Sequence, residues 1–555
     1  MKNRNKKVLY PAFVIMMSLG INSCLNDLNI APLNPNVTPV FSQDEVFAKL
    51  YTSLALTGQK GPDGNGDVAG IDEGTSAFIR LIWNLNELTT DEAMCSWGDV
   101  GIPEMNNNNW GASHSVIQGL YGRFTTDIDF CNHFLEKTQG MTDTKTLRQR
   151  AEARFLRALN YFYLMDMFGN PPFSEVVLIT IPPKQISRLN LFNYINKELR
   201  ECEVDMYAPN ETKSYYRVNK VANWLLRSRI YLNAEVYTGT AKWDSAAIYA
   251  QKVIDPTSGY SLCPTYRHLF MADNDGSSVN KAPNEIIFPI PADGIQTKSW
   301  GGSMFLIAST HSADMPGWGS TDGWAGNRAR ATLVKKFFPG ALPIFNDDND
   351  LTTAYRPGTL KDFRALFLKG GGVIIKSKLN PTKDSINTVA RTMGIISNTF
   401  TEGYSVIKFS NKRADGGKTS DTQFPDMDVP FMRQAEAYLT YAEAVTRGGA
   451  IPSGGTTAIE AINVLRRRAG KTADLTGTLS LQNIIDEWAR EFFFEGRRRM
   501  DLIRFGQYGG TGTGYTWDWK NGVALGADFS ANYNIFPIPY SDISANPNLT
   551  QNPGY

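Results

Sequence analysis

The pattern of apolar and polar positions predicts a chain built mainly from amphipathic helices. In residues 151–168, apolar side chains recur at i, i+3 and i+4, and the run stops at the helix-breaking Gly-Asn-Pro-Pro of residues 169–172. Residues 221–237 and 243–254 predict two helices joined by a turn that contains glycine, with alanines where paired helices approach closely. Their spacing resembles that of tetratricopeptide repeats. Further helices are predicted at 44–57, 431–446, 458–469 and 481–505.

A long central stretch, about 264–422, has a different pattern. It is rich in Gly and Asp, and its strand-like runs, such as 285–290 and 405–409, are short. Loops of this length are too long to be simple connectors, which indicates a function. We therefore expect a mainly α protein in which a helical scaffold, about 41–260 and 425–555, displays a large irregular binding lobe.

The N-terminus carries an export signal. Four basic residues within the first seven are followed by the apolar run 8–21 and by Asn22-Ser23-Cys24. The run is short for a membrane span. A cysteine at the cleavage point is what a bacterial lipoprotein signal requires, although an ordinary signal peptide with an incidental Cys24 is the alternative. We expect residues 1–23 to be removed, Cys24 to be lipidated, and residues 24–40 to form a polar tether.

Composition narrows the classes of function. At 555 residues the chain can form one large domain or two to three smaller ones. A net charge of +1 gives no overall field that would attract nucleic acid. Beyond Cys24 the cysteines are Cys95, Cys131, Cys202 and Cys263, which are widely spaced and form no CxxC pair. This spacing argues against a zinc site or a dense disulfide framework. One or two disulfide bridges are an alternative, but the sequence does not say which cysteines would pair.

Several blocks resemble the SusD/RagB family of outer-membrane lipoproteins. They are EFFFEGRRRMDLIRFG at 491–506, FPIPYSDISANPNLTQNPGY at 536–555, RFLRALNYFYLMDMFGNPP and DVPFMRQAEAYLTYAEA. The resemblance implies a tetratricopeptide-containing helical scaffold with an irregular binding lobe. It also implies a surface-exposed protein, lipid-anchored to the outer membrane, that caps a SusC-like TonB-dependent transporter and binds oligosaccharides, or peptides in some branches.

The signature at 491–506 also has a direct physical interpretation. On one helix, Glu491 and Glu495 would lie one turn apart, with Arg498 and Arg499 just beyond them, so that ion pairs form within the chain. A basic surface for nucleic acid is the rival interpretation. It fails because acidic partners are built in and the phenylalanines indicate a packed face.

Three loop tryptophans are candidate sugar platforms: Trp97, Trp300 and Trp324. Flat aromatic faces stack on the apolar faces of sugar rings, and these three lie among Gly, Ser, Asp and Asn rather than in a helical apolar pattern. A plug in the core is the more common role of a loop tryptophan. The resemblance to a starch-binding member of the family implies an aromatic arc that follows the curve of an α-glucan. It also implies polar contacts from Arg80 and from Asp99 or its neighbours, although the loop after Trp97 is shorter and lacks an expected Asn.

A cation site is implied by the same relative. Asp275, Asp426 and Asp428 resemble its calcium ligands, and Asp426 and Asp428 would project to the same side of an extended segment. The alternative is a set of solvated Asp-rich turns. An EF-hand is excluded, because a loop aligned on Gly276 would begin at Met271 and end at Ala282, neither of which can ligate. We expect any calcium to be structural, and no other cofactor.

No motif marks an enzyme. The four histidines form no HExxH, no GxSxG elbow is present, and the glycine strings at 64–70 and 510–514 lack the strand and helix of a phosphate loop. A glycosidase needs two carboxylates across the scissile bond, and 55 acidic residues leave such a pair open. We therefore expect a non-enzymatic protein that captures starch-like malto-oligosaccharides for the transporter. The alternatives are another glycan or a peptide as ligand, and a glycan-cleaving enzyme.

Overall fold

The structure is a computed structural model, and it describes most of the chain from residue 41 to residue 555. The ranges outside the description are 1–40, 178–180, 210, 212–214, 313–314, 316–317, 339–361, 369–372, 377–383, 388–403 and 472, together with the side chains of 368, 373–376 and 384–387. The predicted signal, lipid cysteine and tether therefore lie outside the described residues. The chain divides into two compact units, 1–46 and 47–555, and the second contains the candidate site together with nearly all of the helices and strands.

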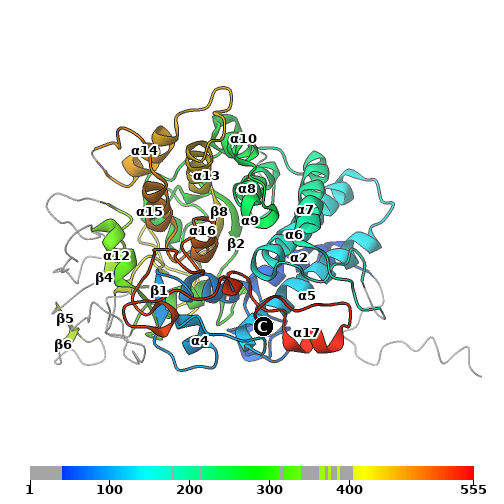
Figure 1. The fold of residues 1–555 in the computed structure, drawn as a ribbon, viewed down its shortest axis with the longest axis horizontal. Coiled ribbons are helices and arrows are strands. Elements are labelled where there is room, and N and C mark those ends of the chain that lie inside the picture. Colours follow the sequence, from blue (N-terminus) through cyan, green and yellow to red (C-terminus); the bar gives the residue numbers. More distant parts are fainter. Residues whose placement is uncertain are drawn as a thin grey trace, which may run out of the picture. The chain divides into compact units, whose positions relative to one another are not determined.

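Helices dominate the described residues, which confirms the prediction of a mainly α fold (Figure 1). Their bounds are α2 Gln43–Ala55, α3 Phe78–Trp83, α4 Ile102–Asn106, α5 Ser115–Lys137, α6 Thr144–Phe168, α7 Arg188–Cys202, α8 Lys220–Leu232, α9 Ala234–Thr238, α10 Trp243–Ile254, α11 Gly302–Ala308, α12 Ala331–Phe337, α13 Ala435–Thr446, α14 Ala458–Arg468, α15 Leu481–Phe492, α16 Arg498–Arg504 and α17 Tyr540–Ala545. Neighbouring helices pack in pairs: α5 on α6, α6 on α7, α8 on α10, and α13 on both α10 and α14.

Local chemistry sets the helix ends and moves some of them from the predicted positions. Helix α6 starts seven residues earlier than the apolar pattern indicates, because Asp143 caps it by accepting the Thr146 N–H at 3.0 Å. The predicted helix 221–237 is two helices, since the chain leaves helical geometry at Asn233. The predicted helix 481–505 is also wrong as a single element. It breaks between α15 and α16, where Phe494 and Gly496 adopt positive φ angles of 64° and 74°.

Strands occur as short antiparallel pairs. They are β1 Ala93–Cys95 with β3 Asn327–Ala329, β2 Ile286–Ile290 with β8 Val429–Arg433, β4 Phe367–Leu368 with β7 Ser405–Val406, and β5 Val373–Lys376 with β6 Asp384–Asn387. In the first pair Cys95 lies opposite Asn327, so two loops more than 200 residues apart in sequence leave the same end of a ladder. This pairing decides where the loop tryptophans lie.

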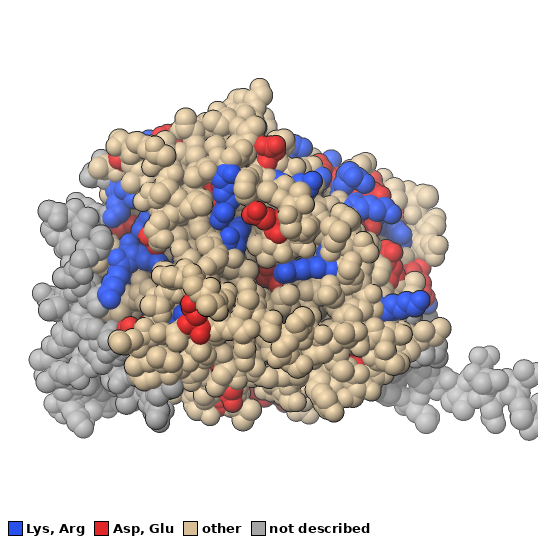
Figure 2. Space-filling view, in the orientation of Figure 1, with Lys and Arg blue, Asp and Glu red and all other residues tan. Residues whose placement is uncertain are grey.

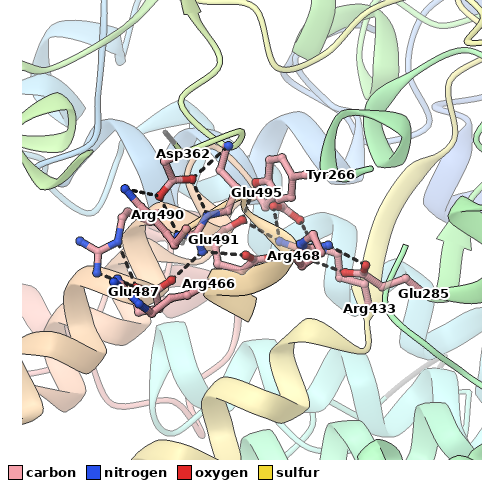
Figure 3. Close-up of polar contacts among 12 residues, drawn as sticks. Tyr266, Glu285, Asp362, Arg433, Arg466, Arg468, Glu487, Arg490, Glu491 and Glu495 are labelled. Atoms are coloured by element: carbon pink, nitrogen blue, oxygen red, sulfur yellow. Dashed lines mark hydrogen bonds and ion pairs between the residues drawn. The ribbon is translucent and has the colours of Figure 1, made fainter. Parts of the chain in front are cut away.

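A buried network of charges joins the C-terminal helices to the strands and loops (Figure 3). Arg433 of β8 pairs with Glu285 at 2.9 Å, with Glu491 at 2.6 Å and with Glu495 at 2.8 Å. Arg364 pairs with Glu487 at 2.6 Å and with Glu491 at 3.0 Å. The predicted pairing of Glu491 and Glu495 with the following arginines of one helix is therefore wrong: both glutamates pair with arginines of other segments, and Arg498 pairs with Asp91 at 2.7 Å. Removing one member of such a network leaves a buried charge without its partner.

The four cysteines of the described part are free and buried: Cys95, Cys131, Cys202 and Cys263. Burial raises the pKa of the Cys95 thiol to about 12 and that of Cys263 to about 11. Among the described residues, no helix combines the length and the apolar character that crossing a membrane would need.

Candidate functional site

Three tryptophans from three loops lie side by side. Trp97 follows β1 and Trp324 precedes β3, so the β1–β3 pairing brings their rings to 6.4 Å between centroids at an interplanar angle of 52°. Trp300 precedes α11, and its ring lies 6.2 Å from that of Trp324 at 56°. Each ring is half-buried. The result is a continuous, bent aromatic surface with Trp324 at its centre.

The rings of this surface pack on apolar side chains. Trp300 and Trp324 pack on a cluster formed by Met304, Ala308 and Phe424. The Phe424 ring lies 5.0 Å from that of Trp300, and the Phe305 ring lies 6.4 Å from that of Trp97. Each of these tryptophans is therefore supported by core side chains and stays partly accessible to solvent.

Hydrogen bonds fix the backbone and the rings of this surface. The indole N–H of Trp97 donates to the Trp324 carbonyl at 3.2 Å, and the Trp324 backbone N–H donates to Ala308 at 2.7 Å. The Trp300 backbone N–H donates to the buried carboxylate of Glu73 at 3.1 Å. Glu73 also accepts from the Thr57 hydroxyl, so the loop before α3 holds Trp300 in place.

Arg80 lies against the same surface. It belongs to α3, and its guanidinium carbon is 5.6 Å from the Trp97 ring centroid and 5.0 Å from that of Phe305. Its Nε is buried and has no hydrogen-bond partner. Burial lowers the pKa of Arg80, while the charges of Asp72, Asp99 and Glu73 oppose that shift. Arginine stays protonated under such shifts, so Arg80 places a cation with a spare donor beside the rings. Asp99 itself is exposed to solvent.

The structure adds residues that the sequence reasoning missed. Glu73, Asp322, Gln423 and Phe424 all contact the tryptophans or their immediate neighbours. The only signal in the sequence was the position of Glu73 in an Asp-Glu-Gly stretch and of Asp322 two residues before Trp324.

The three aspartates of the predicted cation site occupy two neighbouring segments. Asp428 is buried and accepts the Ala292 N–H at 2.9 Å, and Asp426 accepts the Ser420 N–H at 2.7 Å. Burial, with a further contribution from the charge of Asp275, raises the pKa of Asp428 to about 8. The hydroxyls of Tyr215 and Tyr216 also interact with the Asp428 carboxyl, and Oδ1 of Asp426 is buried without a hydrogen-bond partner.

These carboxylates do not amount to a complete ligand set. In the part of the chain that is described, no group of three or more His, Cys, Asp or Glu side chains lies close enough to hold a metal ion. Asp275 is exposed and interacts with Asp428 through its charge. Calcium at this place would need backbone carbonyls and water as its other ligands. The site therefore stays a prediction.

Charged side chains elsewhere give no second candidate on the face drawn in Figure 2. Basic and acidic residues are interspersed there rather than gathered into one basic patch. Such a distribution does not favour a polyanion on that face.

Comparisons with known proteins agree with the motifs. The sequence profile of the SusD family matches residues 284–555. The chain is 43% identical over 579 residues to the starch-binding protein SusD of Bacteroides thetaiotaomicron, with 100% of each chain covered. Among solved structures, a SusD-like carbohydrate-binding protein of Bacteroides fragilis has a TM-score of 0.67 at 20% identity, covering 92% of this chain and 98% of that one. Surface glycan-binding protein A of Bacteroides thetaiotaomicron, in complex with laminarihexaose, has a TM-score of 0.64 at 17% identity over the same shares. The chain belongs to the SusD/RagB family.

Proposed function

We propose that this protein is a cell-surface glycan-binding protein that captures starch-like malto-oligosaccharides. The observation that carries the proposal is the bent surface of Trp97, Trp324 and Trp300, with neighbouring ring centroids 6.4 and 6.2 Å apart. Rings tilted by 52° and 56° suit a ligand that curves, as an α-glucan does. A relative that is 43% identical over its whole length is named a starch-binding protein, which supports the same ligand class.

In the proposed mode the three indoles stack on successive glucose units. Arg80, Asp99 and their neighbours then bind hydroxyl groups at the rim of the sugar. If each stack contributes about 1–2 kcal/mol and ordering of the sugar offsets part of it, the affinity is millimolar to high micromolar. The protein binds its ligand and does not cleave it. Release of reducing sugar from starch by the purified protein would contradict this.

The test is calorimetric titration with maltoheptaose. We expect heat with the wild type and about a tenfold or greater loss of affinity in Trp300→Ala, because one stacking face is removed. Trp243→Ala is the matched control, since Trp243 is also half-buried but begins α10 of the helical scaffold. Unchanged affinity in Trp300→Ala would contradict the proposal that the aromatic surface binds the glycan.

A β-glucan of the laminarin type is the second candidate. Two solved relatives support it: one is a complex with laminarihexaose and another is titled a laminarin-binding SusD-like protein, with TM-scores of 0.64 and 0.63. Both are at most 20% identical to this chain, which is why starch is preferred. Affinity electrophoresis on starch, laminarin and unrelated polysaccharides distinguishes the two. Retardation by laminarin alone would replace the proposed ligand while keeping the glycan-binding role.

Anchoring and delivery follow from the N-terminus and the family. We propose that Cys24 carries lipid, that the protein is held at the outer membrane facing outwards, and that it passes glycan to a SusC-like TonB-dependent transporter. In the native host, Cys24→Ala should shift the protein from the membrane fraction to a soluble one. Co-purification of a TonB-dependent transporter with the wild type in mild detergent tests the partner.

Calcium, if bound, would be held by Asp426 and Asp428, with Asp275 nearby, and would stabilise the fold. At a hundredfold excess over its Kd, a ligand that binds only the folded state contributes about 2.7 kcal/mol. We expect the melting temperature of the wild type to fall with EDTA and to recover with calcium. The melting temperature of Asp428→Asn should change with neither EDTA nor calcium. A wild type whose melting temperature does not change with EDTA would contradict the calcium site.

A further inference from the structure

Asp322 accepts a hydrogen bond from the tryptophan at the centre of the aromatic surface. Its Oδ2 accepts the indole N–H of Trp324 at 3.4 Å. The backbone carbonyl of Asp322 accepts the indole N–H of Trp318 at 2.8 Å. One residue therefore contacts two indole groups, through its side chain and through its main chain.

The carboxylate of Asp322 is also bound by Gln423. The side-chain amide of Gln423 donates to both oxygens of Asp322 at 3.3 Å. The two loops are also joined by the Ser320 hydroxyl, which donates to the Gln423 carbonyl at 2.7 Å, and by the Thr321 backbone N–H, which donates to the Thr422 carbonyl at 2.9 Å. Asp322 is thus fixed by a loop 101 residues further along the chain.

Gln423 is fixed in turn by Asp421. The Asp421 carboxylate accepts the backbone N–H groups of Gln423 at 2.7 Å and of Phe424 at 3.0 Å. Lys298 pairs with Asp421 at 3.3 Å. Since Phe424 packs on Trp300, the same short segment supports two of the three tryptophans.

The chain of contacts continues to the third tryptophan. Trp97 donates its indole N–H to the Trp324 carbonyl at 3.2 Å, so the two neighbouring rings are held together. Resting on the proposed glycan-binding function, we infer that Asp322 is a positioning residue: it holds the Trp324 indole at the tilt that lets all three rings stack on one glycan chain.

The experiment is a double-mutant cycle between Asp322 and Trp324, with affinity for maltoheptaose measured by calorimetry. Loss of one orienting hydrogen bond predicts that Asp322→Ala weakens binding by about 3- to 10-fold. In the Trp324→Ala background the same change should have no effect. Asp322→Asn keeps an acceptor oxygen and should recover most of the affinity. Asp474→Ala is the matched control, because Asp474 is an exposed aspartate that pairs with Arg467 beside α14.

A spectroscopic measurement follows the ring orientation without ligand. Indoles 6.2 and 6.4 Å apart at oblique angles couple in the far-ultraviolet circular dichroism spectrum. Asp322→Ala should reduce this exciton band, and Asp322→Asn should retain it. If Asp322→Ala folds poorly, Gln423→Ala tests the same contact from the other side, with a smaller loss that also vanishes in the Trp324→Ala background.

The outcomes separate this inference from the function on which it rests. Equal losses in both backgrounds would mean that Asp322 acts other than through the Trp324 indole, and unchanged affinity in Asp322→Ala would mean that it has no role; either overturns the inference alone. If the wild type binds laminarihexaose instead, the cycle is run with that sugar. A wild type that binds no glycan refutes the proposed function, and the inference with it.

Discussion

Gly326 shows how little space the aromatic surface leaves at a single position. It lies two residues after Trp324, and a Cβ atom built on it would overlap Cε2, Cζ2 and Nε1 of Trp97. Only a residue without a side chain lets the two loops approach this closely. The contact therefore places the Trp97 indole against the backbone that follows Trp324.

Gly326→Ala should displace Trp97 and weaken glycan binding. We expect about a tenfold loss of affinity, because one stacking face is moved away from the other two. Gly98→Ala is the matched control, since Gly98 adjoins Trp97 and has open space where its Cβ would lie. Calorimetry with maltoheptaose measures both variants, and equal affinities would show that the ring adapts to the added methyl group.

The buried carboxyl of Asp127 makes the stability of the protein depend on pH. It is buried on α5, and burial raises its pKa to about 7, although the charge of Arg123 opposes the shift. A carboxyl whose pKa is higher in the folded than in the unfolded state keeps its proton on folding, so its contribution is present below about pH 4 and is lost as the pH rises to about 7. Asp127→Asn should therefore be more stable relative to the wild type at pH 8 than at pH 5. Urea unfolding at both pH values measures this, and a pH-independent difference would contradict it.

The three tryptophans of the candidate site could be predicted from the sequence because they are conspicuous. Trp97, Trp300 and Trp324 lie in Gly- and Asp-rich loops, where a large aromatic residue does not fit a helical pattern. Glu73 and Asp322 could not be found in this way. Glu73 acts on a backbone 227 residues away, and the partner of Asp322 in the opposite loop is 101 residues away. Such pairings depend on loop packing, which has no periodic signature.

At the scale of elements, helix interiors were predictable and their ends were not. The apolar spacing of α10 and α14 reflects burial of one face, and the long apolar runs of α6 and α13 reflect burial on nearly every side. The ends depend on single polar contacts. The break after α15 follows from Glu87, which accepts the N–H groups of Gly496 at 2.7 Å and Arg497 at 3.0 Å from more than 400 residues away.

The start of α15 offers a test of such an end. Ser480 and Asn483 form a capping box in which each side chain accepts the backbone N–H of the other. Ser480→Ala should lower the free energy of unfolding by about 1 kcal/mol, because the Asn483 N–H loses its acceptor. Ser278→Ala, at an exposed serine of the irregular region, should leave it nearly unchanged. Urea denaturation compares them, and equal midpoints would mean that the cap contributes nothing.

At the scale of the whole molecule, the buried charge network joins segments that are far apart in sequence. Arg433 comes from β8, Glu491 from α15, Glu285 from the residue before β2, and Arg364 from the loop-rich region. These contacts hold the C-terminal helices against the strands and loops (Figure 3). The motif that identifies the family therefore stabilises the architecture rather than the binding surface.

Arg433→Met should destabilise the protein strongly. Removing one cation from a buried network leaves carboxylates without full compensation, at a cost of about 3–5 kcal/mol. Arg467→Met is the matched control. Arg467 pairs with two carboxylates, Glu460 and Asp474, where Arg433 pairs with three, but its side chain is 46% exposed, so its ion pairs are screened by solvent. A similar urea midpoint for both variants would show that the network contributes no more than surface pairs.

The same network predicts loss of stability in acid. Burial raises the pKa of Glu487, but the charges of Arg364 and Arg490 outweigh it and bring the value to about 2. For Glu491, burial also raises the pKa, but the charges of Arg468, Arg433 and Arg364 outweigh burial, so the pKa is lowered overall. Carboxyls with depressed folded pKa values stabilise the fold above their unfolded value, about 4.3, and lose that contribution as the pH falls. The urea midpoint should therefore fall steeply between pH 5 and pH 3, and a flat profile there would contradict the network's role.

The inert interior thiols make the protein suitable for site-specific labelling. Cys95, Cys131, Cys202 and Cys263 are buried, and burial raises their pKa values, so alkylating reagents that require an accessible thiolate should leave them unmodified. In a form that begins after Cys24, a cysteine introduced at Val100, which is 85% exposed and three residues from Trp97, would then react alone. A fluorophore attached there would report glycan arrival at the rings in real time, without a labelled sugar.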